Sequence, residues 1–162
     1  MSGSTEHRAP DAFEVTGRKP VVLNLGTARR MLALVQRIVD DVLNHQQRLS
    51  HLLPEQERLD RSRHKLDWPN RQRRYHVQEE VTAVEGHLRQ ATEELQGLGG
   101  VLIDAGIGQV GLPTVVNGRL AFFSWKPGET GLRYWHFPGE NLRRPIPSSW
   151  KESDEISLSG KA

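Results

Sequence analysis

The sequence predicts an α+β domain in which a long antiparallel helical hairpin, coiled-coil-like, packs with a small antiparallel β-meander. Apolar residues recur at alternating spacings of four and three along two stretches, which is typical of helices that pack along a seam. A polar bend joins the two stretches, as in a helical hairpin. Short aromatic and aliphatic runs separated by Gly-containing turns follow them, and this pattern favours a meander.

The length of 162 residues fits one folded domain with two tails. We expect residues 20–147 to form a single α+β domain, with the helical hairpin at 25–99 and the β-meander at 101–146. The flanking segments are rich in Ser, Gly and charge. We therefore expect a disordered tail at 1–19 and a loose tail at 148–162.

Composition narrows the classes of function. A net charge of +2 gives no whole-molecule argument for nucleic-acid binding. The absence of cysteine excludes disulfides, thiolate catalysis and cysteine-ligated metal, and it fits the reducing cytosol. No apolar run is long enough to span a bilayer. We therefore expect a cytoplasmic protein with no membrane segment.

The first helix is predicted to begin near Leu25, with Asn24 as its N-cap. Pro54 lacks the amide hydrogen that a helix interior uses, so we expect it to kink or restart the helix. The apolar seam comprises Ala28, Met31, Val35, Ile38, Val42, His45, Leu49 and Leu52. The histidine on this seam has no second metal-ligating residue at a suitable spacing, so we interpret it as structural and predict no metal site.

The apolar stripe of this helix is wider than its seam. One antiparallel partner helix covers only part of such a stripe. We therefore predict a homo-oligomer, most simply a two-fold dimer, that buries Leu32, Val39 or Leu43.

The second helix is predicted to begin around Arg71, because Trp68-Pro69-Asn70 reads as a break before it. Gly97, Gly99 and Gly100 end the helix. Its seam comprises Val77, Val81, Val84, Leu88, Ala91, Leu95, Leu98 and Leu102.

Two hairpins are predicted after the helices. Asn117-Gly118 is a favoured two-residue turn, and it joins Leu112–Val116 to Arg119–Trp125. A Pro-Gly turn then joins the second of these strands to Leu132–Phe137. We pair the last residue of Arg119–Trp125 with the first residue of Leu132–Phe137.

This register places Phe122 opposite Trp135 and Ala121 opposite His136. We expect Trp135 to be core and to lie over the helical hairpin. His136 then lies on the other face, with space above it because Ala121 is small. Trp150 is expected to dock on the domain.

One run of residues extends through the predicted meander: Gly118-Arg119, Trp125, Gly128-Glu129, Tyr134-Trp135-His136, Gly139, Arg143 and Pro145-Ile146. This run resembles a bacterial family known only as domain of unknown function 2203. In that family a strand ending in Trp and a Gly-Glu turn precede a Trp-His pair, which is followed by Gly, Arg and Pro. The resemblance covers most of residues 20–147 and implies the fold. It implies no activity, since the family has none assigned.

One candidate ligand-binding site comprises His136, Glu140, Arg143 and Arg144. A histidine exchanges protons near neutral pH, and guanidinium groups bind carboxylate or phosphate. The alternative is structural: the histidine bonds to a neighbouring carbonyl, and the arginines pair with acids such as Asp104 or Glu129.

The bend, residues 58–74, is called the tip below. It combines seven basic residues with two acids and the aromatic residue Trp68. Basic residues interleaved with aromatic rings suit phosphates and stacked bases. The candidate nucleic-acid-binding residues are Arg63, Lys65, Arg71, Arg73 and Arg74. The alternative is a solvated tip whose arginines pair with neighbouring glutamates.

These observations favour a non-enzymatic binding or assembly protein built on a self-associating helical hairpin. One alternative is a nucleic-acid-associated protein that uses the tip to bind RNA or another polyanion. A second alternative is an enzymatic or small-molecule site around His136. We assign no catalytic residue, cofactor or metal from the sequence.

Overall fold

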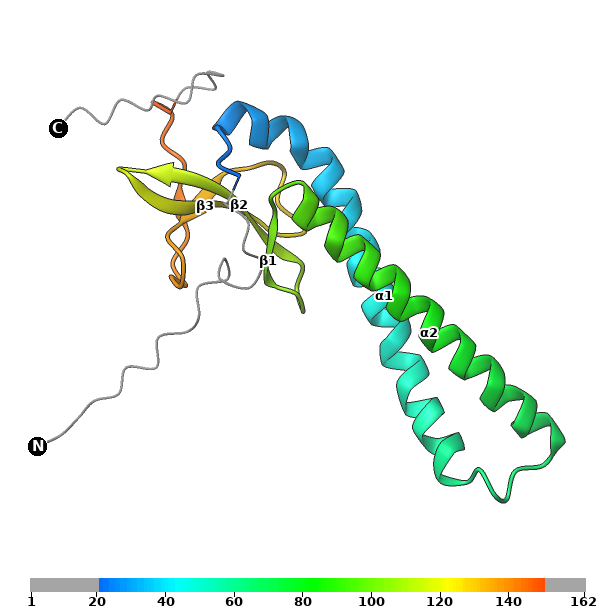
Figure 1. Ribbon diagram of the computed structural model, residues 1–162. Coiled ribbons are helices and arrows are strands. Elements are labelled where there is room, and N and C mark those ends of the chain that lie inside the picture. The colour runs from blue at the N-terminus through cyan, green and yellow to red at the C-terminus, as the bar shows by residue number, and fades with distance from the viewer. Residues whose placement is uncertain (1–20, 151–162) are drawn as a thin grey trace, which may run out of the picture.

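The computed structural model describes residues 21–150. Two long helices form an antiparallel hairpin, and a five-stranded sheet packs at the end of the hairpin opposite the tip (Figure 1). The α+β prediction is confirmed. The predicted tails fall largely on residues 1–20 and 151–162, which lie outside the described residues.

Helix α1 spans Leu25–Arg61. The side chain of Asn24 caps it and accepts a hydrogen bond from the backbone N–H of Thr27 at 2.7 Å. The helix continues through Pro54 to Arg61, so this proline does not end it.

Helix α2 spans Trp68–Gly97 and therefore begins earlier than the predicted start at Arg71. Asp67 is the N-cap, and its side chain accepts a hydrogen bond from the backbone N–H of Asn70 at 3.1 Å. Pro69 lies in the first turn, where a helix needs no amide hydrogen from it. The Trp-Pro-Asn sequence is thus the start of α2 and not a break before it.

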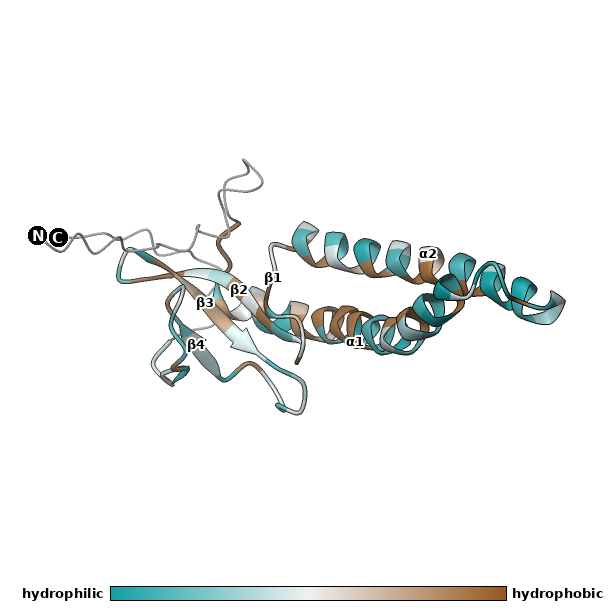
Figure 2. Cartoon of the chain, turned by 90° about the horizontal axis from the view of Figure 1, so that it is seen from below, coloured by the Kyte–Doolittle hydropathy of each residue, from teal (hydrophilic) through white to brown (hydrophobic). Residues whose placement is uncertain are grey.

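The buried apolar residues form two separate cores. The root core joins both helices to the sheet, and it includes Val35, Val39 and Leu95 of the helices with Leu112 and Phe123 of the sheet. The distal core lies near the tip and comprises Leu52, Leu59, Val77 and Val81. Figure 2 shows the apolar faces of α1 and α2 turned toward each other and polar residues at the tip.

The sheet is an antiparallel meander with the strand order β1-β2-β3-β4-β5. Its strands are β1 (Val101–Asp104), β2 (Gln109–Val116), β3 (Arg119–Trp125), β4 (Tyr134–His136) and β5 (Arg144–Pro145).

The predicted Asn117-Gly118 turn is confirmed. Asn117 has φ of 53° and Gly118 has φ of 73°, as a two-residue turn with both central residues in the left-handed region requires. Val116 pairs with Arg119 directly beside the turn.

The predicted register of β3 and β4 is wrong by one residue. His136 pairs with Phe122, and Trp135 pairs with Phe123. A shift of one residue changes which cross-strand partners share a face. His136 therefore shares a face with Phe122, whereas Ala121 belongs to the root core on the side of Trp135. The predicted space between Ala121 and His136 does not exist.

Trp135 lies in the root core, as predicted, although its strand partner is Phe123. The expected docking of Trp150 is confirmed, since its ring centroid lies 5.4 Å from that of Trp135 and 6.3 Å from that of Phe123.

The sheet also covers the wide apolar stripe of α1. Leu32 is 8% exposed and Val39 is fully buried, both in the root core, and Leu43 packs against that core. A Cβ on Gly108, in the β1–β2 turn, would lie 2.8 Å from Val39. The residues predicted to form a dimer contact are thus packed in or against the root core of their own chain. The homo-oligomer itself stays a prediction.

Candidate functional site

His136 is almost fully buried, with 2% of its surface exposed, on the sheet face that it shares with Phe122. Its Nδ1 lies 2.8 Å from the carbonyl oxygen of Phe137. A carbonyl oxygen can only accept, so Nδ1 carries a hydrogen in this contact. Nε2 is buried without a hydrogen-bond partner. The imidazole is therefore not accessible to a ligand from solvent.

Arg143 does not bond to His136 but binds two other residues. Its Nε donates to Ser124 Oγ at 3.0 Å, and its Nη2 donates to the Ser124 carbonyl at 3.0 Å. Its terminal nitrogens grip both carboxylate oxygens of Glu129 at 3.0 and 2.5 Å. The guanidinium also lies over the ring of Tyr134, 4.5 Å from its centroid. We call this arrangement the Arg143–Glu129 clasp.

The clasp is mostly shielded from water, since the side chains of Arg143 and Glu129 are each 15% exposed. Burial by itself would raise the pKa of Glu129. The hydrogen bonds from Arg143 and from the Lys126 backbone, together with the charges of both residues, lower it below its ordinary value. Glu129 is therefore held as an anion by the fold.

Glu140 and Arg144 form a second, more exposed pair. Arg144 donates to both carboxylate oxygens of Glu140 at 2.8 and 3.1 Å, and the two side chains are 38% and 34% exposed. Burial acts to raise the pKa of Glu140, but the bonds from Arg144 and from the Phe137 backbone outweigh it, so the pKa is lowered. The charge of His136 adds to this lowering.

The structure thus does not gather the four predicted ligand-binding residues into one site, and of these four only Glu140 and Arg144 bond to each other. Two surface hollows on α2 are lined by other residues. The burial of His136 and the pairing of both arginines with glutamates do not support the ligand-binding hypothesis. The structural alternative describes the contacts better.

At the tip, three arginines are paired with carboxylates: Arg61 with Glu57, Arg73 with Glu55, and Arg74 with Asp60. The Arg73 pair joins α2 to α1 through two hydrogen bonds of 2.6 and 2.9 Å. These bonds lower the pKa of Glu55. Arg73 and Arg74, both predicted to bind nucleic acid, therefore hold the two helices together.

Four other tip cations form no ion pair within residues 21–150: Arg58, Arg63, Lys65 and Arg71. All of them are exposed. Arg71 donates from Nε to the carbonyl of Leu66 at 3.0 Å, which orients its guanidinium. Arg63, Lys65 and Arg71 are thus the predicted nucleic-acid-binding residues that keep an unneutralised charge.

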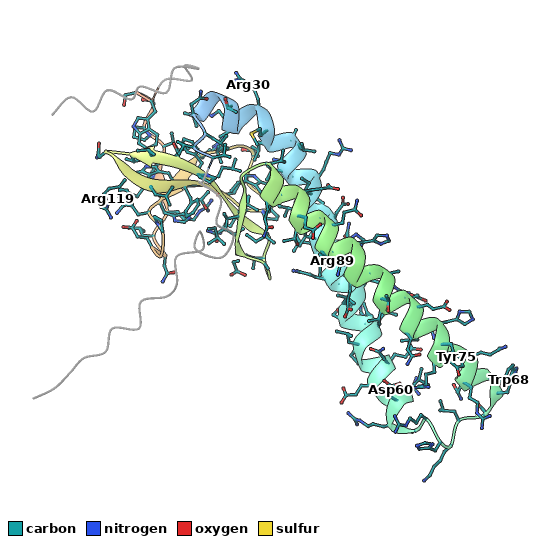
Figure 3. The ribbon with its side chains drawn as sticks, viewed as in Figure 1. Arg30, Asp60, Trp68, Tyr75, Arg89 and Arg119 are labelled. Carbon is teal, nitrogen blue, oxygen red and sulfur yellow. The ribbon has the colours of Figure 1, made fainter. Side chains whose placement is uncertain are left out.

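Two aromatic rings at the tip end of α2 face solvent. Trp68 is 68% exposed and Tyr75 is 63% exposed. Figure 3 shows both residues at this end of α2, with Asp60 across from them on α1.

A contact between His45 and His87 was missed by sequence reasoning. Their ring centroids lie 5.4 Å apart across the helical hairpin. A search along one helix for suitable spacings cannot find a partner on another helix. Within the described residues no group of three metal-ligating side chains exists.

Residues 22–146 match the model of a family described as "Uncharacterized conserved protein (DUF2203)". The chain belongs to the DUF2203 family. A search of curated proteins found no match, and a search of solved structures found none either. None of the helices described in this DUF2203 chain is both long and apolar enough to cross a membrane.

Three of the residues that carry the DUF2203 resemblance, Trp125, Glu129 and Arg143, meet in and around the Arg143–Glu129 clasp. Trp125 ends β3 and donates from its indole nitrogen to the carbonyl of Glu129 at 3.1 Å. Gly128 has φ of 96°, a conformation that favours glycine, and it positions Glu129 in the turn. This part of the motif therefore describes how the loop between β3 and β4 closes. Ser124, the other partner of Arg143, carried no signal in the sequence.

Proposed function

We propose that the protein is a non-enzymatic, cytoplasmic binding protein whose helical hairpin presents a recognition surface at its tip, and that its ligand is a nucleic acid. The observation that carries the proposal is the set of exposed cations at the tip that have no carboxylate partner among the described residues. Arg63, Lys65 and Arg71 are exposed there, and the same segment carries the exposed ring of Trp68.

The distribution of charge supports this proposal. Residues 55–75 contain seven basic and four acidic side chains, a net charge of +3. The whole chain carries +2, so the remainder carries −1. The positive charge is therefore concentrated at the end of the hairpin away from the sheet, where it attracts the phosphates of a nucleic acid.

Self-association is less favoured as the main role, since the sheet covers Leu32 and Val39. An enzymatic role of His136 is also less favoured, because 2% of its surface is exposed. Leu32, Val39 and His136 all lie outside the tip. A homo-oligomer formed through another surface is compatible with the proposal, and sedimentation of the full chain tests it.

The proposal is tested by fluorescence anisotropy of labelled RNA and DNA, as single strands and as duplexes, titrated with the full chain at low and at physiological salt. The tip variant combines Arg63→Glu, Lys65→Glu and Arg71→Glu. These residues form no ion pair within residues 21–150, so the variant should fold. The control variant carries the same change in charge on exposed residues elsewhere: Arg37→Glu, Arg89→Glu and Arg133→Glu.

We expect the wild type to bind at low salt and the tip variant to lose at least about tenfold in affinity, with a salt dependence weaker by about 2 in log–log slope. The control variant should retain most of the affinity. Failure of the wild type to bind any of these nucleic acids at low salt would overturn the proposal. An equal loss in the control variant would also overturn the proposal, because binding would then depend on the overall charge of the protein and not on the tip.

A further inference from the structure

We infer that Trp68 and Tyr75 form a stacking surface for the bases of a single-stranded nucleic acid, with Arg71 between them as the phosphate contact. The inference rests on the proposed function and names the class of nucleic acid that the tip binds. Its geometric basis is the spacing of three residues on α2. Residues 68, 71 and 75 are three and four positions apart, so they lie along one face of α2.

This face points away from α1. Val77 is fully buried in the distal core, and it lies about 200° around the helix from Tyr75, since each residue turns the helix by about 100°. Arg73 faces α1 as well, because it binds Glu55 there. Neither Trp68 nor Tyr75 belongs to the distal or the root core. Packing within the described chain thus does not account for either ring.

The two rings are spaced for bases. Seven residues of helix separate them by about 10 Å along the axis. Successive bases along a stacked strand are about 3.4 Å apart, so a short run of nucleotides spans the distance between the rings. Stacking on a protein ring requires a base whose face is free, which a single strand offers and a continuous duplex does not.

Arg71 supplies the contact to the phosphate between these bases. Its Nε is bonded to the Leu66 carbonyl at 3.0 Å. The two terminal nitrogens of its guanidinium make no hydrogen bond within residues 21–150, so they can grip a phosphate from two donors. The charge of the tip excludes a cationic ligand. The exposed rings distinguish this surface from a merely basic one, which would bind any polyanion.

The test compares ligands that differ in their bases. Anisotropy is measured with labelled single-stranded RNA, single-stranded DNA of the same sequence, and the matching duplex. Inorganic polyphosphate, a polyanion without bases, is used as a competitor. The variants are Trp68→Ala and Tyr75→Ala, with Trp68→Phe and Tyr75→Phe as conservative controls that keep a ring. Thermal melting monitors folding, which these exposed substitutions should leave unchanged.

We expect each alanine variant to lose at least about fivefold in affinity for the single strands, since stacking contributes about 1–3 kcal/mol per base. Affinity for the duplex, competition by polyphosphate and the salt dependence should stay near wild type. Each phenylalanine variant should retain most of the affinity. Comparison of the RNA and DNA single strands then decides which of the two binds more tightly.

Three results would overturn the inference. The alanine variants could bind single strands as tightly as wild type while the tip charge variant loses binding, and the proposed function would then stand alone. The wild type could bind duplex or polyphosphate as tightly as single strands. The stacking inference would then fail, and the proposed function would again stand alone. Absence of binding to every probe would overturn both proposals. In that case a dimer seen by sedimentation and lost in Trp68→Ala would assign the surface formed by Trp68 and Tyr75 to self-association.

Discussion

Replacing Arg143 by alanine should lower the free energy of unfolding by about 3 kcal/mol, because breaking a buried ion pair leaves a charge without compensation. Arg143 makes four hydrogen bonds, two to Glu129 and two to Ser124, and it covers the ring of Tyr134. The substitution removes all of these contacts and leaves the Glu129 carboxylate, 15% exposed, without its arginine.

The magnitude follows from burial. Truncating one partner of a buried pair costs about 3–5 kcal/mol, and the residual exposure of Glu129 to water favours the lower end of that range. An exposed pair contributes about 0–1 kcal/mol. Domains of this kind are stable by about 5–15 kcal/mol, so the loss is large but the variant should still fold.

Urea unfolding followed by tryptophan fluorescence measures the effect. Arg144→Ala is the matched control, because Arg144 is the next residue and also binds a glutamate through two bonds, but in a pair that is 38% and 34% exposed. It should cost about 1 kcal/mol or less. Equal losses in the two variants would refute the argument that burial of the clasp determines its contribution.

The pH dependence gives an independent check on the same contact. The folded state lowers the pKa of Glu129, so the unfolded state binds the proton more readily in acid. The stabilisation is therefore present above the ordinary value of 4.5 and is lost as the pH falls through the lowered folded-state value. Between about pH 5 and pH 3 the stability of wild type should fall more steeply than that of Glu129→Gln. Equal slopes would contradict this assignment.

Other substitutions test the packing, and thermal and urea unfolding measure all of them. Gly86→Ala should raise the free energy of unfolding by up to about 1 kcal/mol, because a Cβ there meets nothing within 4 Å. Gly111→Ala should lower it, since its Cβ would lie 2.9 Å from the Phe122 ring. Trp135→Ala should cost about 3–5 kcal/mol, because the ring is 9% exposed in the root core. His45→Leu should stabilise the helical seam, where a polar residue lowers stability; an unchanged melting temperature would count against that.

The helical hairpin was predictable from the sequence because seam residues such as Val35 and Leu95 follow a local period. The turn at Asn117-Gly118 was equally predictable, since its dipeptide specifies its geometry. Local signals misled at Trp68-Pro69-Asn70, where a proline before the predicted start of α2 belongs to the first turn of the helix.

The register of β3 and β4 depends on contacts that are distant in sequence. Glu129 accepts hydrogen bonds from Arg143, which lies fourteen positions later in the sequence. Because this contact holds the loop between β3 and β4, that loop is longer than a simple turn. The pairing ends at Ser124 with Tyr134, one residue away from the predicted register. The surroundings of His136 could not be predicted without that register.

The two cores have a consequence for the stability of the tip. Leu59 is 1% exposed in the distal core, so Leu59→Ala should cost about 2–5 kcal/mol locally. The distal core has four buried residues and the root core has seventeen, so the tip should open without unfolding the sheet. Hydrogen exchange in Leu59→Ala should therefore quicken near Leu52 and Val77 while amides of β2 and β3 keep their protection. Faster exchange of equal size in the sheet would show that the hairpin and sheet unfold as one unit. In that case the recognition surface could not be ordered separately from the rest of the fold.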